Sequence, residues 1–193
     1  MSRRRRDQIL AGAGAIVDEQ GPLVATVVGA DTFPAVELTV VTGAGAAALT
    51  RGTDITLDYA WFVGHPDDAG AIVHELAHAV MRVPTHEPPV GWLTEGIADY
   101  VRDVLGFDAR HTRAGYLPGG AMRGYQSTAH FLMYLEGRRH GTVREVSKRL
   151  SAGIYTVDVF RDLLGIPLYR LVEMYEAEQG ALGRGHPARR PPA

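Results

Sequence analysis

The hydrophobic pattern of the chain changes its period at Pro66, and this change limits the folds that the chain can adopt. Before Pro66, short runs rich in Val, Thr and aromatic residues alternate with Gly-rich turns, which predicts strands at residues 23–28, 36–41 and 55–59. After Pro66, apolar residues recur at helical spacing. A small sheet in the first third of the chain followed by helices indicates the α+β class.

The apolar residues Ile9, Ala13 and Ile16 fit one face of a further helix at the start of the chain, with Ser2 as its N-cap. The helices predicted after the period changes cover residues 66–82, 93–105, 127–139, 143–150, 157–164 and 168–179. At 193 residues, one domain over residues 1–180 is the expected organisation. The remaining segment, 181–193, is rich in Gly, Pro and Arg and is predicted to be a mobile tail.

A HExxH sequence at residues 74–78 lies inside the first helix predicted after Pro66. Residues four apart share one helix face about 6 Å apart along the axis, so His74 and His78 can bind the same metal ion. Glu75 lies at the edge of that face, where its carboxylate can reach a metal-bound water. The chain has no Cys, so His and carboxylate side chains must hold any transition metal. The motif alone also fits an amphipathic helix with solvated polar residues.

The next predicted helix carries two acids, Glu95 and Asp99, one helical turn apart. Because catalytic zinc commonly has three protein ligands and an open position, Glu95 can be the third ligand. Asp99 can then accept a hydrogen bond from a ligating histidine and fix its tautomer. The alternative is that both are surface acids. The residues around them are mostly apolar, however, so acids on this helix need partners.

These motifs resemble the gluzincin pattern of metallopeptidases and, more narrowly, the basic secretory protein family of plant and bacterial peptidases. The stretches that carry the resemblance are residues 73–78, 93–102, 124–132, 141–146 and 160–165. The similarity spans about residues 35–178, and the Glu-Gly-Ile-Ala-Asp-Tyr block is its most specific part. The resemblance implies a zincin-like fold, in which a small twisted sheet lies over the HExxH helix and the C-terminal half is helical.

The resemblance also implies that His74, His78 and Glu95 bind Zn²⁺ and that Glu75 is the general base. The expected function is therefore a zinc-dependent peptidase that hydrolyses peptide bonds of peptide or protein substrates with a metal-activated water. The alternative is a zinc-binding interaction or sensor module with little or no turnover. Glu75 favours the enzyme, because a purely structural site does not need this carboxylate.

Neither motif supplies a group that stabilises the oxyanion formed during hydrolysis, a role that a Tyr or His fills in gluzincins. Four residues are candidates: Tyr125, Tyr116, His111 and His130. Tyr125 is preferred, because it begins the third matching stretch at the start of a predicted helix. A tyrosine packed on the core with its hydroxyl in water is an equally simple interpretation.

The charge and hydropathy of the chain predict neither a nucleic-acid partner nor a membrane segment. The formal net charge is −2, and the four arginines at residues 3–6 have no second basic cluster to support them. No apolar run approaches the roughly 20 residues that a membrane-spanning helix needs. Arg3–Arg6 and the apolar segment after them resemble the start of a signal peptide, but Asp7 interrupts it and no cleavage site follows. A cytoplasmic location is therefore expected, although the family resemblance leaves secretion open.

Overall fold

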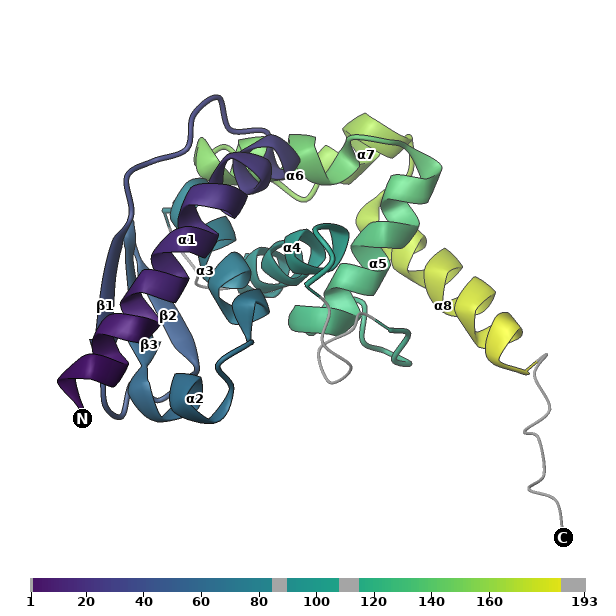
Figure 1. The fold of residues 1–193 in the computed structure, drawn as a ribbon. Helices are drawn as coiled ribbons and strands as arrows, with labels where there is room; N and C mark the ends of the chain where they lie inside the picture. Colours follow the sequence, from purple (N-terminus) through teal and green to yellow (C-terminus); the bar gives the residue numbers. More distant parts are fainter. Residues whose placement is uncertain (1, 85–89, 108–114, 185–193) are drawn as a thin grey trace, which may run out of the picture.

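The structure, a computed structural model, describes residues 2–84, 90–107 and 115–184 (Figure 1). Within these ranges a small three-stranded sheet is followed by a largely helical remainder, which confirms the predicted α+β class. The elements in chain order are α1 (Arg3–Val28), β1 (Glu37–Val41), β2 (Ala48–Arg51), β3 (Asp54–Asp58), α2 (Tyr59–Gly64), α3 (Ala69–Met81), α4 (Gly91–Val104), α5 (Tyr125–Arg138), α6 (Thr142–Ser151), α7 (Val159–Leu164) and α8 (Leu168–Arg184).

The sheet has the order β1-β3-β2, with β3 parallel to β1 and antiparallel to β2. The short hairpin between β2 and β3 turns at Gly52, whose φ of 64° is readily adopted by glycine. The sequence did not predict β2, because Ala48 and Leu49 are weak strand formers that follow a Gly-rich segment. β2 is nevertheless an edge strand of the sheet, and it packs against α3.

The strand predicted at residues 23–28 is wrong, because this segment is the last part of α1, which continues through Pro22. Val17, Val24 and Val28 are buried at helical spacing, where α1 packs on α3 and β1. This part of α1 also packs closely on Phe33, since a Cβ atom on Gly21 would come within 2.4 Å of the Phe33 ring. Tertiary contacts therefore override the strand preference of the Val and Thr residues.

α3 lies at the centre of the molecule, between α1, β2 and α4 (Figure 1). Pro66 and Asp67 precede the helix, which begins at Ala69, so the expected start at Pro66 is too early. Asp68 is the N-cap, and its carboxylate accepts a hydrogen bond from the Ala71 N–H at 3.1 Å. Almost the whole helix is buried, so its polar side chains need partners from neighbouring elements.

α4 and α5 cross at Gly96, which leaves no room for a side chain. A Cβ atom on Gly96 would lie 2.1 Å from Cγ2 of Thr128 on α5. Thr128 has no exposed surface, and Gly96 is also buried. The glycine that follows Glu95 therefore sets how closely the two helices approach.

The C-terminal helices complete the core around Phe160, Leu171 and Tyr175, none of which is exposed. α8 extends to Arg184, a few residues into the segment predicted as a tail, and residues 185–193 lie outside the described part of the chain. Among the helices of the described segments, none combines the length and apolar character that crossing a bilayer requires.

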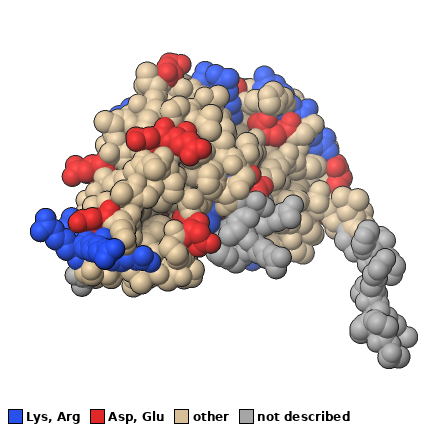
Figure 2. Space-filling view, in the orientation of Figure 1, with Lys and Arg blue, Asp and Glu red and all other residues tan. Residues whose placement is uncertain are grey.

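The face shown in Figure 2 carries Lys and Arg side chains where α1 begins and again along its upper right edge. Acidic side chains lie between these two groups, so the basic side chains on this face do not join into one surface.

Candidate metal centre

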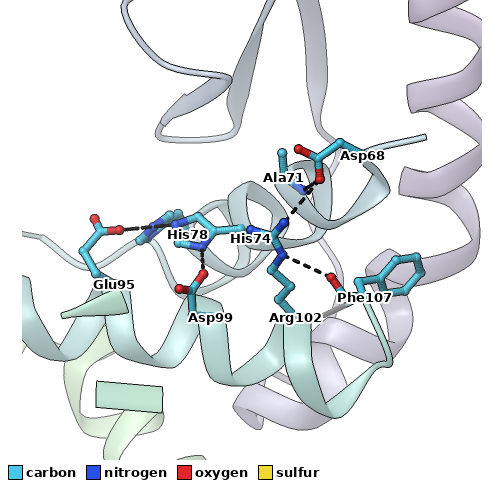
Figure 3. A network of polar contacts seen from close by, with 8 residues as sticks. All are labelled: Asp68, Ala71, His74, His78, Glu95, Asp99, Arg102 and Phe107. Carbon is cyan, nitrogen blue, oxygen red and sulfur yellow. Dashed lines mark hydrogen bonds and ion pairs between the residues drawn. The ribbon is translucent and has the colours of Figure 1, made fainter. Parts of the chain in front are cut away.

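Three potential metal-ligand atoms from α3 and α4 lie close together at partly buried positions (Figure 3). The Nε2 atoms of His74 and His78 are 3.2 Å apart. Oε2 of Glu95 lies 3.2 Å from Nε2 of His74 and 3.6 Å from Nε2 of His78. The structure thus brings together the three residues that the two motifs single out as ligands.

The spacing of these donor atoms fits a tetrahedral metal ion. With zinc–nitrogen bonds of about 2.0–2.1 Å and tetrahedral angles, ligand atoms lie about 3.3 Å from one another. The three observed distances, from 3.2 to 3.6 Å, are close to this value. Two imidazoles and one carboxylate are also a donor set that suits zinc and leaves a fourth position open.

Asp99 hydrogen-bonds the imidazole nitrogen of His74 that faces away from the cluster. Nδ1 of His74 donates a hydrogen bond to Oδ1 of Asp99 at 2.7 Å, and Asp99 is only 3% exposed. When His74 is neutral and its proton is on Nδ1, the lone pair of Nε2 is free to bind a metal ion together with His78 and Glu95. Asp99 is therefore neither a surface acid nor one of the three clustered residues.

The acids around His74 stabilise positive charge at this place. Burial lowers the pKa of His74, but its hydrogen bonds with Asp99 and Glu95 outweigh burial and raise that pKa to about 9. Burial similarly raises the pKa of Glu95, but hydrogen bonds with His74 and His78 hold it well below its usual range. A bound cation would take the place of the proton that these groups otherwise share.

Glu75 lies beside the cluster and is not part of it. It is 9% exposed and lines the same cavity of about 420 Å³ as the three donors. Thr50 on β2 donates a hydrogen bond to Oε2 of Glu75 at 2.7 Å. Residues 46–50, which include the first three residues of β2, form one side of this cavity.

Arg102 joins the two helices that carry the cluster (Figure 3). Its Nη2 donates to the N-cap carboxylate of Asp68 at 3.2 Å, and its Nε donates to the Phe107 carbonyl at 3.2 Å. Gly70 on α3 leaves room for this guanidinium, since a Cβ atom there would lie 2.5 Å from Nε. The start of α3 is thereby tied to the end of α4, which fixes His74 relative to Asp99 and Glu95.

Tyr125 lies at the cavity, with its ring stacked on that of His74 at a centroid distance of 6.2 Å and an angle of 12°. It is 52% exposed, and its backbone has a φ of 50°, in the left-handed region. Gly124 before it donates its N–H to Oγ1 of Thr128 at 2.8 Å, which anchors this turn. The negative charge of Glu95, with a smaller effect of burial, raises the pKa of Tyr125, so its hydroxyl stays a donor at neutral pH.

Two of the other oxyanion candidates, Tyr116 and His130, have hydrogen-bond partners elsewhere in the described structure. Tyr116 donates its hydroxyl to Oε2 of Glu176 at 2.8 Å, and His130 hydrogen-bonds the Tyr175 hydroxyl at 2.8 Å. Neither lines the cavity as the described residues form it, and His111 lies outside the described part of the chain.

Three polar residues that line the cavity were not predicted from the sequence: Thr50, Arg102 and Gln126. Arg102 lies in the stretch that follows Glu-Gly-Ile-Ala-Asp-Tyr, and its spacing of three residues from Asp99 places it near the same helix face. Gln126 follows Tyr125 directly. Thr50 has no signal in its local sequence, since its contact with Glu75 joins residues far apart along the chain.

The chain was compared with known proteins and protein families. Residues 37–175 match the sequence model of a protein family that is described as peptidases of plants and bacteria. This match includes every residue of the cluster as well as Thr50, Glu75, Asp99 and Tyr125. No curated protein and no solved structure gives a significant match to the chain. Since the family match covers well over half of the sequence, the chain belongs to the basic secretory protein family, the peptidases of plants and bacteria.

Proposed function

We propose that this peptidase depends on zinc held by His74, His78 and Glu95, with Glu75 as the general base. The observation that carries the proposal is the meeting of three donor atoms at 3.2–3.6 Å, with one histidine held by a buried carboxylate. These three donors leave one coordination position for water or substrate. An open position beside Glu75 favours a peptidase over an interaction or sensor module, in which a closed site suffices.

Zinc, when bound, polarises the substrate carbonyl and lowers the pKa of a water in the open position. Glu75 would accept a proton from the attacking water as the water oxygen bonds to the carbonyl carbon, and would then donate this proton to the nitrogen as the carbon–nitrogen bond breaks. The hydroxyl of Tyr125 donates a hydrogen bond to the oxygen on which negative charge develops. During this reaction, the hydrogen bond to Asp99 keeps the proton of His74 on Nδ1.

The substrate peptide binds along β2. This strand is at the edge of the sheet, so the backbone groups on its outer side have no strand partner within the described sheet. The cavity wall formed by residues 46–50 includes the first three residues of this strand. An extended peptide that adds to β2 would pass beside Glu75 and the metal cluster, with its main chain held independently of its side chains.

The purified protein is expected to contain about one zinc ion per chain and to cut peptides only when that zinc is present. Elemental analysis measures the metal. Digestion of a peptide library, read by mass spectrometry with and without a chelator, measures zinc-dependent cleavage and its sequence preference. Protein that holds no metal and gains no thermal stability with added zinc would contradict the proposal.

Replacing Asp99 with Ala should weaken zinc binding about 10- to 100-fold, the usual effect of removing a hydrogen-bond partner of a ligating histidine. The structure supports this expectation, because Asp99 contacts His74 and lies outside the donor cluster. Competition with a chelating dye measures the affinity. Part of the activity should return at saturating zinc.

The exposed Asp162 on α7 offers a control, since Asp162→Ala should leave zinc affinity unchanged. Unchanged affinity in Asp99→Ala would remove the positioning role of this carboxylate. A loss larger than that of Glu95→Ala would instead make Asp99 the ligand.

A further inference from the structure

The side chain of Thr50, on the edge strand β2, donates a hydrogen bond to the proposed general base, Glu75. We propose that Thr50 positions the carboxylate of Glu75 for proton transfer, a role that rests on the proposed peptidase mechanism. Thr50 is a positioning residue in this proposal, since it acts through Glu75 and not on the substrate.

The contact between Thr50 and Glu75 is short. Oγ1 of Thr50 lies 2.7 Å from Oε2 of Glu75 and 3.1 Å from the backbone oxygen of the same residue. A hydroxyl carries one hydrogen, and hydrogen bonds to an ionised carboxylate are shorter and stronger than those to a carbonyl. The Thr50 hydroxyl therefore donates mainly to Oε2.

This hydrogen bond gives the two carboxylate oxygens of Glu75 different roles. Among the described residues, Thr50 is the hydrogen-bond partner of the Glu75 carboxylate, and Oε1 has none. The described residues do not fully bury Oε1, and Glu75 lines the cavity, so we infer that Oε1 is accessible from the cavity. Oε2 is thus anchored to the sheet, and Oε1 is left to accept the proton.

Anchoring matters because the last torsion angle of a glutamate side chain is broad and roughly two-fold. Proton transfer requires the base within hydrogen-bond distance of the attacking water, and displacement by about 1 Å can reduce a rate about 100-fold. Thr50 is itself fixed, because it pairs with Ile55 on β3, a residue with no exposed surface. The strand on which the peptide binds therefore also sets the place of the base.

The test replaces Thr50 with Val, which keeps the shape of the side chain and removes the hydroxyl. For a peptide that the parent enzyme cuts, kcat should fall about 10- to 100-fold, while KM and zinc content stay at the parent values. Thr50→Ser retains a hydroxyl and should restore most of kcat. The control is Thr56→Val on β3, because Thr56 lies outside the cavity and makes no hydrogen bond through its side chain within the described residues.

A second measurement needs no catalysis. Thermal unfolding of metal-free Thr50→Val, Glu75→Ala and the double variant forms a double-mutant cycle. If the hydrogen bond exists in solution, the loss of Tm in the double variant is smaller than the sum of the two single losses. Additive losses would overturn the proposal.

Failure of this inference is distinguishable from failure of the proposed function. If the parent protein binds zinc and cuts peptides, and Glu75→Gln lowers kcat about 10²- to 10⁴-fold, the proposed function stands. A Thr50→Val variant with the parent kcat, or a Thr50→Ser variant as slow as Thr50→Val, would then overturn the role of Thr50 alone. A lower Tm with unchanged kcat would show that Thr50 only ties β2 to α3. A parent protein without turnover would overturn both.

Discussion

Replacing Glu75 with Gln is expected to reduce kcat for peptide hydrolysis about 10²- to 10⁴-fold, the usual contribution of a general base. The amide has nearly the shape of the carboxylate but cannot take up the proton of the attacking water. Its oxygen can still accept the hydrogen bond that Thr50 donates, so the fold should be retained. Zinc content should also be unchanged, because Glu75 is not among the three clustered donors.

Steady-state kinetics, elemental analysis and thermal unfolding of the same preparation test this expectation together. Glu145→Gln on α6 serves as the control, since it makes the same chemical change away from the cavity. A Glu75→Gln protein that hydrolyses peptides at the parent rate would show that another group is the base.

Replacing His78 with Ala should remove zinc and activity together. The change deletes one of the two imidazole donors and leaves two donor atoms, which cannot complete a three-ligand site. The loss of affinity should exceed the about 10- to 100-fold expected when a partner such as Asp99 is removed. Ala is the best helix former, so α3 should still form.

Chelator competition and metal analysis after gel filtration measure the loss of zinc. The matched control is His140→Ala, because the His140 side chain is fully exposed and lies outside the cluster. Retention of zinc at the parent affinity in His78→Ala would exclude His78 as a ligand.

The spacing of His74 and His78, and of Glu95 and Asp99, could be interpreted from the sequence because each pair lies on one helix. Within a helix, the separation along the chain fixes the separation in space, so i and i+4 residues necessarily share a face. The sequence could not establish which histidine Asp99 contacts. That choice depends on how α3 and α4 pack, and in the structure it is His74.

Strand and helix boundaries near the sheet were harder to predict, because the contacts that decide them are distant along the chain. The segment ending at Val28 has the composition of a strand, yet it is helical because its buried face packs on α3. β2 has the composition of a loop, yet it is a strand because it pairs with β3. The role of Thr50 follows from that pairing, so it has no local signal either.

The hydrophobic core includes α1, although the family match does not. The match begins at residue 37, whereas α1 ends at Val28 and contributes Ala13, Val17 and Val24 to the same core as α3. Removal of α1 would open one side of the helix that carries both histidines and expose apolar surface to water. A fragment cut to the matched residues would therefore retain every proposed ligand and yet bind zinc poorly, since an unfolded chain does not hold them together.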